Sequence, residues 1–348
     1  MIHSSLRTVE WKDNSVVMID QTKLPNELVY VTYTNYQDVA IAIRDLIVRG
    51  APAIGVSGAF GLALAALQST ASTKESLMED LETARKILHE TRPTAINLAW
   101  GLERIMNTAR SANDVSEIRE SVVKEAKRMA QEDIEVNMRM GKHGSQLFND
   151  NDTIMTHCNA GALATVAYGT ALGVIRATKD SGKKIKVIAT ETRPVMQGSR
   201  LTAFELKHDG IDVSLIPDTA VGYSMANKLV SKVIVGADRI LRTGHVYNKI
   251  GTYQVALMAK QHNIPFYVAA PLSTFDLKSR PEEVIIEQRK SSEVTGVAGK
   301  KTAPDGINVI NPAFDMTPPE LITGIITEAG IAKPPFEESI RKLFESKL

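Results

Sequence analysis

Residues 156–165 read Thr-His-Cys-Asn-Ala-Gly-Ala-Leu-Ala-Thr, and this stretch decides the fold and the place of its chemistry. The residues before it, 152–157, predict a short buried strand, and residues 162–171 are small, apolar and compatible with a helix. Asn159 and Gly161 mark the sharp turn between the two. In an open parallel sheet, ligands bind outside the carboxyl ends of the strands, and a helix N-terminus offers free N–H groups to an anion. The stretch therefore predicts an anion-binding site at one edge of a parallel sheet.

Cys158, in the middle of this turn, is the only cysteine among the 348 residues. Two interpretations are open at this point. A free cysteine is often a small buried hydrophobe, and it becomes reactive only where exposure and local charge allow it. His157 precedes it on the strand and points to the opposite face, which favours a structural role for the imidazole over a direct cysteine–histidine pair.

The composition is that of an ordinary globular chain, with 43% hydrophobic residues, 23% charged residues and a net charge of +1. A charge so close to zero gives no reason to expect a nucleic-acid partner. A single cysteine excludes an internal disulfide framework and a cysteine-based zinc site. The first residues lack the layout of a signal peptide, and the most apolar run, 51–67, is short for a membrane helix and carries early glycines and a proline. We expect a cytoplasmic protein without a membrane partner.

Apolar periodicity divides the chain into two kinds of pattern. The first part predicts short strands at 15–20 and 28–33, followed by helices at 36–48, 58–67, 74–90, 95–109 and 115–148. The later part predicts strands at 154–158, 186–191, 212–217, 232–238 and 266–270, separated by helices at 162–181, 198–209, 220–230 and 252–262. This alternation predicts an α/β fold with a parallel sheet. We expect residues 1–130 to form a smaller, mainly helical domain that starts with β-strands, and residues 131–348 to form the catalytic domain.

Polar residues gather where these elements end. They are Arg49, Gly50 and Ala51 between two helices, Arg92 before a helix, Gln197 and Asp238 after strands of the α/β part, and Asn248 and Lys249 before a helix. Each has a structural alternative: a glycine C-cap, a solvated arginine or an N-cap aspartate. Together they describe an anion site with two arginines, a lysine, a thiol and a carboxylate.

Several familiar site motifs are missing from the sequence. It has no dinucleotide-binding Gly-x-Gly-x-x-Gly after the first strand of the α/β part, no metal-ligand spacing, no nucleophile elbow and no phosphate loop of the NTPase type. The pattern therefore predicts a reaction on a small phosphorylated substrate that needs neither a metal nor a cofactor.

Six motifs follow one another along the chain. They are Arg49-Gly-Ala-Pro-Ala-Ile-Gly, Thr91-Arg-Pro-Thr-Ala-Ile-Asn-Leu, Cys158-Asn-Ala-Gly, Glu191-Thr-Arg-Pro-Val-Met-Gln-Gly-Ser-Arg, Gly236-Ala-Asp-Arg and Asn248-Lys-Ile-Gly-Thr-Tyr. Together they resemble the methylthioribose-1-phosphate isomerase family, and the resemblance covers nearly the whole chain. The same fold serves ribose-1,5-bisphosphate isomerases and the regulatory subunits related to translation initiation factor 2B. Those subunits generally lack the complete cysteine and aspartate pair, so the presence of both residues favours an enzyme.

The resemblance implies an aldose–ketose isomerase of methionine salvage, which converts 5-methylthioribose 1-phosphate into 5-methylthioribulose 1-phosphate. Carried over position by position, Cys158 and Asp238 are the catalytic pair. The substrate-binding positions are Arg49, Gly50, Ala51, Arg92, Gln197, Asn248 and Lys249. The resemblance also implies a homodimer whose subunits have a small N-terminal domain and a Rossmann-like C-terminal domain.

One segment departs from the family's pattern. Thr243-Gly-His-Val-Tyr247 stands where family members often carry small, polar residues, directly before Asn248. Because these side chains are bulkier, two substrates that differ in the group at C5 of the sugar stay possible. A methylthio group is the commoner assignment, and the departure favours the alternative, 5-deoxyribose 1-phosphate. The alternative to an enzyme is a non-catalytic subunit on the same fold, which regulates a partner or senses a sugar phosphate or a nucleotide. The presence of both Cys158 and Asp238 argues against it.

The implied reaction needs two events. Phosphate blocks the anomeric oxygen, so ring opening requires a proton on the ring oxygen, and the hydrogen on C2 must then reach C1. We expect Asp238 to supply that proton, and Cys158 to take or steer the C2 hydrogen or stabilise the developing charge. A cis-enediol route and a direct hydride shift both stay open. A dry pocket would favour the hydride route and help to keep Asp238 protonated.

Overall fold

The computed structural model describes residues 6–297 and 299–345, and the chain forms two compact units. Unit 1 comprises Met1–Arg139 together with Ala160–Gly173, and unit 2 comprises Met140–Asn159 together with Val174–Leu348. The chain thus enters unit 2, returns to unit 1 for one short segment after Asn159, and then completes unit 2. The predicted domain boundary between residues 130 and 131 stays a prediction.

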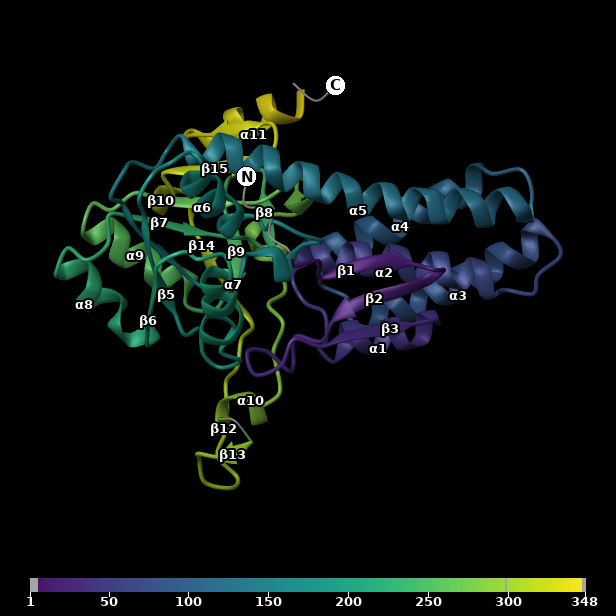
Figure 1. Ribbon diagram of the computed structural model, residues 1–348, viewed down its shortest axis with the longest axis horizontal. Helices are drawn as coiled ribbons and strands as arrows, with labels where there is room; N and C mark the ends of the chain where they lie inside the picture. Colours follow the sequence, from purple (N-terminus) through teal and green to yellow (C-terminus); the bar gives the residue numbers. More distant parts are fainter. Residues whose placement is uncertain (1–5, 298, 346–348) are drawn as a thin grey trace. The chain divides into compact units, whose positions relative to one another are not determined.

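Unit 1 combines a small antiparallel sheet with a group of helices (Figure 1). Its strands are β1 (Val9–Lys12), β2 (Ser15–Ile19) and β3 (Tyr30–Tyr33), and its helices are α1 (Tyr36–Arg44), α2 (Ala51–Gln68), α3 (Lys74–Glu90), α4 (Ile96–Ser111) and most of α5 (Val115–Ser145). The central strand β2 pairs with both neighbours, so that Val16 lies opposite Trp11 on one side and Tyr33 on the other. The predicted strands and helices are present, and β1 was not predicted.

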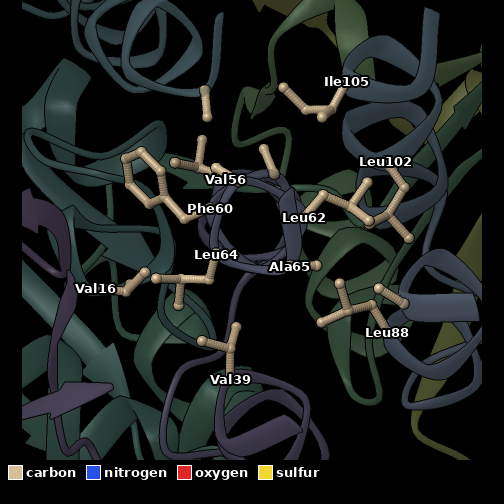
Figure 2. Packing of buried hydrophobic residues seen from close by; sticks show 14 of the residues in the cluster. Val16, Val39, Val56, Phe60, Leu62, Leu64, Ala65, Leu88, Leu102 and Ile105 are labelled. Atoms are coloured by element: carbon tan, nitrogen blue, oxygen red, sulfur yellow. The ribbon is translucent and has the colours of Figure 1, made fainter. Parts of the chain in front are cut away.

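Helix α2 is the centre of the unit 1 core. Its side chains point outward on every side, and Phe60, Leu62 and Leu64 meet residues of the neighbouring elements such as Val39 and Leu102 (Figure 2). In the described part of the chain it is the one helix long and apolar enough to cross a membrane, and 78% of that window is buried inside the protein. A helix that is apolar all round and covered by protein is a core helix.

The start of α2 differs from the prediction. The helix begins at Ala51, whereas residues 51–57 were expected to be a loop because of their glycine and proline content. Pro52 lies in the first turn, where a missing N–H costs nothing. Gly55 lets α4 approach closely, since a Cβ at this position would lie 2.7 Å from the carbonyl oxygen of Asn97. The prolines and glycines therefore start and pack this helix rather than preventing it.

Unit 2 is built on a seven-stranded sheet in the order β16-β15-β10-β7-β4-β5-β6. The strands are β4 (Thr153–Thr156), β5 (Lys186–Thr190), β6 (Val213–Ile216), β7 (Lys232–Val235), β10 (Phe266–Ala269), β15 (Gly324–Thr327) and β16 (Gly330–Ala332). All neighbouring pairs are parallel except β15–β16. The six parallel strands follow the doubly wound order of dinucleotide-binding folds, which confirms the predicted Rossmann-like α/β class.

Helices cover both faces of this sheet. They are α6 (Ala171–Asp180), a π-helical turn η2 (Gly198–Thr202) that leads into α7 (Ala203–His208), α8 (Val221–Ala226), α9 (Thr252–Gln261) and α11 (Phe336–Glu345). The short helix α10 (Ser292–Thr295) lies apart from this sheet in Figure 1. Single 3₁₀ turns are η3 (Asp218–Ala220), η4 (Leu272–Thr274), η5 (Pro281–Glu283) and η6 (Pro319–Leu321). Helices α8, α9 and α11 share one apolar core with the strands. The chain reverses direction across the sheet after β6, so right-handed connections place α6 and α7 on the opposite face.

A second, smaller sheet lies in unit 2. Its order is β11-β8-β9-β14, with β11 (Phe275–Asp276), β8 (Arg239–Leu241), β9 (Val246–Lys249) and β14 (Phe314–Thr317). A separate hairpin, β12 (Gly296–Val297) with β13 (Lys300–Lys301), lies within the predicted excursion and stands away from the seven-stranded sheet in Figure 1. The small sheet was not predicted, because its strands are short and pair with distant segments.

The helix predicted at 162–181 is wrong in its first half. Only a 3₁₀ turn, η1 (Ala162–Ala164), follows the Cys158 turn, and the regular helix α6 begins at Ala171. Tyr168 has a φ of +74°, which no α-helix accommodates. The hydroxyl of Thr165 also donates to the carbonyl oxygen of Ala167 at 2.8 Å, a local bond that competes with helix formation. The helix N-terminus expected directly after Gly161 is therefore absent from this turn.

Candidate active site

Cys158 lies in the turn that follows the central strand β4. Its backbone is left-handed, with a φ of +67°, and the residue is 7% exposed. The Cys158 N–H donates to Oγ1 of Thr192 at 2.9 Å, and the hydroxyl of Thr202 donates to the Cys158 carbonyl oxygen at 2.6 Å. A positive φ is uncommon for a residue with a side chain, so the two hydroxyls hold the cysteine in a conformation that it would not adopt alone.

A buried ion-pair network supports the residue after the cysteine. The side-chain amide of Asn159 donates to Oε1 of Glu205 at 2.8 Å. Arg176 in turn donates to Oε2 of Glu205 and to Oδ2 of Asp209, each at 2.7 Å, and none of these ionised groups is appreciably exposed. Removing one member of a buried, hydrogen-bonded charge pair leaves an uncompensated charge, so the loss of any of these side chains would destabilise the turn. It fixes the turn from the side of α6 and α7.

His157 is a structural residue in this turn. Its Nδ1 lies 2.7 Å from Oγ1 of Thr190, and its Nε2 lies 2.9 Å from the carbonyl oxygen of Ile250. Burial lowers the pKa of the imidazole, which is therefore neutral near pH 7. The carbonyl can only accept, so Nε2 carries the proton and Nδ1 accepts from the threonine. Both ring nitrogens are engaged away from the thiol, in agreement with the structural role predicted for His157. Gly251 is needed beside the ring, since its φ is +99° and a Cβ there would lie 3.0 Å from the imidazole.

The loop after β5 brings Gln197 to the same edge of the sheet. The carboxylate of Asp218 accepts the N–H groups of Thr192 and Arg193, at 2.8 and 2.6 Å, and so fixes the start of this loop. Gln197 is 5% exposed, and its side-chain oxygen has no hydrogen-bond partner among the described residues. A buried amide oxygen without a partner costs about 1–3 kcal/mol, which is the condition expected of a group that waits for a ligand.

Asp238 lies between β7 and β8 and is partly buried. Its N–H donates to the carbonyl oxygen of Tyr247 at 2.9 Å, which joins this residue to the strand that carries Asn248 and Lys249. The side-chain amide of Asn248 donates to the hydroxyl of Thr252 at 3.0 Å. The ammonium of Lys249 lies 4.9 Å from the centre of the Phe314 ring. Asn248 and Lys249 are residues of the buried strand β9, and they precede helix α9 as the sequence predicted.

Asp315 on β14 holds the connection from this strand to α9. Its carboxylate accepts the N–H groups of Gly251 and Tyr253 at 2.7 and 3.1 Å. Burial raises its pKa to about 6, although both hydrogen bonds and the nearby Lys249 oppose that rise. No sequence signal marked Asp315, because it is distant in the chain and belongs to no recognised motif.

The sheet topology explains why these residues come together in unit 2. Strands β5 and β7 flank β4 on either side, and the strand order reverses between β4 and β7. Cys158 follows β4 and Asp238 follows β7, so both lie at the carboxyl ends of the two strands that border this reversal. In open α/β sheets this crevice is where ligands bind. Cys158 and Asp238 therefore both lie at the edge of the sheet where ligands bind in folds of this kind.

The other predicted site residues belong to unit 1. Gly50 caps the start of α2 with a φ of +99°, and a Cβ there would overlap the backbone of Ala164. Ala51 is the first residue of the helix, and Arg49 directly precedes its cap. Arg92 lies in the turn between α3 and α4 and is half-buried. Within residues 6–297 and 299–345, no group of three or more His, Cys, Asp or Glu side chains is arranged to hold a metal ion.

Comparison with known proteins agrees with the resemblance found in the sequence. Residues 47–334 match the initiation factor 2 subunit family. The chain is 52% identical over 339 residues to the methylthioribose-1-phosphate isomerase of Thermosipho africanus, covering 97% of this chain and 98% of that protein. It is also 52% identical over 350 residues to the protein of the same name from Koribacter versatilis, covering 100% and 99%.

Two solved structures are similar over nearly their whole length. The 5-methylthioribose 1-phosphate isomerase of Pyrococcus horikoshii has a TM-score of 0.91 and 46% identity, covering 98% of this chain and 96% of that one. A structure from A. fulgidus named translation initiation factor eIF-2B, subunit delta, has a TM-score of 0.87 and 49% identity, covering 98% and 100%. The chain belongs to the initiation factor 2 subunit family and, within it, to the methylthioribose-1-phosphate isomerase family.

Proposed function

We propose that this protein is an aldose–ketose isomerase that converts 5-methylthioribose 1-phosphate into 5-methylthioribulose 1-phosphate, a step of methionine salvage. The observation that carries the proposal is the position of Cys158 and Asp238 on both sides of the strand-order reversal. The full-length similarity to isomerases of that name supports it. We further propose that the protein works in the cytoplasm as a homodimer.

We assign substrate binding to residues of unit 2 and to residues of unit 1. Gln197 has a buried oxygen suited to accept a hydrogen bond from a sugar hydroxyl. Asn248 is proposed to contribute its amide and Lys249 its positive charge. In unit 1, Arg49 and Arg92 are proposed to donate to phosphate, because the guanidinium fork matches phosphate oxygens. Gly50 and Ala51 are proposed to bind through the backbone.

The chemistry begins with ring opening. Asp238, as an acid, is proposed to protonate the ring oxygen, so that the C1–O bond of the ring breaks and C1 becomes electron-poor while keeping its phosphate ester. In the hydride route, hydrogen moves from C2 to C1 with its electron pair and the C2 hydroxyl loses its proton, which leaves a ketone. In the enediol route, a base removes the C2 hydrogen as a proton to give an enediol phosphate, and C1 then gains a proton while the C2 hydroxyl loses one, which leaves the same ketone. Cys158 is proposed to act at C2 in either route.

Isotope transfer separates the two routes. In deuterated water, the enediol route introduces solvent deuterium at C1 of the product, whereas the hydride route keeps the original hydrogen. Mass spectrometry of the product measures this directly. We expect little solvent deuterium if the reacting atoms are shielded from water.

The proposed activity is tested by a parallel assay of three sugars. Purified protein is given 5-methylthioribose 1-phosphate, 5-deoxyribose 1-phosphate and ribose 1,5-bisphosphate, and formation of each ketose is measured. We expect the highest kcat/KM with the methylthio sugar. Preference for the 5-deoxy sugar would support the second candidate, and failure to turn over any of the three would support a regulatory subunit.

The 5-deoxyribose 1-phosphate alternative rests on the bulky segment that ends at Tyr247. The structure places this side chain 5% exposed, with its hydroxyl donating to the carbonyl oxygen of Pro281 at 3.1 Å. Successive side chains alternate along a strand, so Tyr247 and Asn248 point to opposite faces of β9. Tyr247 can therefore line the space for the C5 group only on the face of β9 that it shares with Lys249.

If Tyr247 narrows the space for the C5 group, Tyr247→Ala should raise kcat/KM for the methylthio sugar relative to the 5-deoxy sugar. Pocket discrimination is worth about 1–3 kcal/mol per methylene, so the ratio should shift roughly tenfold or more. Tyr247→Phe keeps the ring, removes the bond to Pro281 and serves as the matched control. An unchanged ratio in Tyr247→Ala would show that this residue has no part in selectivity.

Arg92→Ala should weaken phosphate binding and leave the chemical step nearly intact. A charge-assisted contact to phosphate is worth about 1.5–3 kcal/mol, which corresponds to a rise in KM of roughly 10- to 150-fold. Steady-state kinetics measure the change, and Arg85→Ala is the control because Arg85 pairs with Glu82 on the outer side of α3. An unchanged KM would place Arg92 outside the binding site.

A further inference from the structure

An unbroken series of hydrogen bonds runs from the Cys158 turn to the strand that carries Lys249. The Cys158 N–H lies 2.9 Å from Oγ1 of Thr192, which lies 3.2 Å from Oγ1 of Thr190. Oγ1 of Thr190 lies 2.7 Å from Nδ1 of His157, and Nε2 of the same ring lies 2.9 Å from the carbonyl oxygen of Ile250. Every side chain in the series is buried.

The donors in this series can all point one way, from the Cys158 turn toward Ile250. The carbonyl oxygen of Ile250 accepts from Nε2, so Nδ1 of His157 accepts from Thr190, and the hydroxyl oxygen of Thr190 is then free to accept from Thr192. The other acceptor within reach of the Thr192 hydroxyl is the backbone carbonyl oxygen of Thr190, at 3.3 Å. The oxygen of Thr192 in turn accepts from the backbone N–H of Cys158. Bonds aligned in this way polarise one another, and inside a protein such a network is stiff.

From this arrangement we infer that Thr192 is a positioning residue for Cys158, held in place by Thr190 and His157. The inference rests on the proposed function, since it gives Thr192 a part in the same reaction. The left-handed φ of Cys158 sets the direction of its Cα–Cβ bond, and the Thr192 hydroxyl binds the N–H on which that φ depends. Without this bond the turn can relax toward an ordinary φ, and the sulfur moves away from its place.

The series ends beside a proposed substrate-binding residue. Ile250 follows Lys249 directly in the chain, so the turn that holds the thiol and the strand that holds two proposed substrate-binding residues are joined through buried bonds. The loop between β5 and Gln197 contributes Thr192 itself. Thr192 therefore joins Cys158, in the turn after β4, to the neighbouring parts of the site and holds them in place relative to one another.

The test compares Thr192→Val, which keeps the shape and removes the hydroxyl, with Thr192→Ser, which keeps the hydroxyl. Thr178→Val is the matched control, because Thr178 is also buried but donates to Val174 within α6. Two quantities are measured in each variant: kcat and KM for 5-methylthioribose 1-phosphate, and the rate at which iodoacetamide alkylates Cys158. The second measurement reports on one site only, since the chain has no other cysteine.

Thr192→Val should lower kcat roughly 10- to 100-fold with KM within about twofold, because a displacement of about 1 Å can cost this much. Its alkylation rate should differ several-fold from that of the wild type. Thr192→Ser and Thr178→Val should stay close to the wild type in both measurements. Thr190→Val should repeat part of the effect without touching Cys158, and it replaces Thr192→Val if that variant fails to fold. Adding Thr190→Val to Thr192→Val should cost little more, because residues of one network are not additive.

The inference is overturned if Thr192→Val matches the wild type in both kcat and alkylation rate, or if Thr192→Ser is as impaired as Thr192→Val. Failure of the proposed function looks different. A wild-type protein that isomerises none of the three sugars contradicts the function, while the alkylation rates of the variants still decide whether Thr192 positions the thiol.

Discussion

Asp238→Asn is expected to lower kcat by about 10²- to 10⁴-fold, while KM stays within about threefold of the wild type. An amide has nearly the shape of a carboxyl group but cannot deliver a proton to the ring oxygen. The backbone N–H of Asp238, which donates to Tyr247, is unaffected by the change, so the strand that follows should keep its place. Steady-state kinetics with 5-methylthioribose 1-phosphate measure both constants.

Asp305→Asn is the control for the loss of one negative charge. Asp305 is 97% exposed at its side chain and pairs with Lys301 in the hairpin region. This variant should keep the kinetics of the wild type. If Asp238→Asn instead raised KM strongly and kept kcat, Asp238 would be a binding residue, and the acid would have to be sought elsewhere in the site.

Cys158→Ser should fold normally and lose at least about 100-fold in kcat, the lower end of what a positioned acid–base group supplies. A hydroxyl is far harder to ionise than a thiol, whose ordinary pKa is about 8.5, and it is also less polarizable. The turn should survive, because the bonds from Thr192 and Thr202 reach the backbone and not the sulfur.

Cys158→Ala completes this experiment by removing the hydrogen-bonding group altogether. Thermal unfolding of both variants should remain near that of the wild type, which separates loss of chemistry from loss of folding. Near-normal kcat in Cys158→Ala would falsify a catalytic role for the thiol, and the residue would then be the small buried hydrophobe that its sequence context also allows.

The sequence predicted the elements whose signal is local. The five predicted strands of the α/β part begin within one residue of β4, β5, β6, β7 and β10, because buried strands of a parallel sheet are short apolar runs with clear starts. Only the strand predicted at 232–238 runs three residues past the observed end of its strand, β7. Helix α3 lies where its periodicity placed it, since its buried leucines recur at helical spacing along one face. The positions of Cys158 and Asp238 at strand ends followed from the same runs.

Features that depend on distant partners were not predicted. Residues 162–170 look helical by composition, yet Val166 donates to Asp133 and accepts from Thr8, and these bonds replace the helical ones. Strand β9 is defined by its pairing with β14, more than sixty residues later in the chain. The hydroxyl of Thr192 could have been suspected from its place in the Glu191 motif, but only the fold shows that it binds the Cys158 backbone.

The returning segment Ala160–Gly173 has a consequence for how the protein is made. Helix α2 is apolar on every side, and its core includes Val166 from that segment. As the chain leaves the ribosome, unit 1 cannot be completed until residue 173 has been synthesised, more than a hundred residues after the end of α2. Until then the part of α2 that packs against η1 stays uncovered, and apolar surface left open during folding is aggregation-prone and is what chaperones bind. Unit 1 therefore closes late during synthesis, although most of its residues come first in the chain.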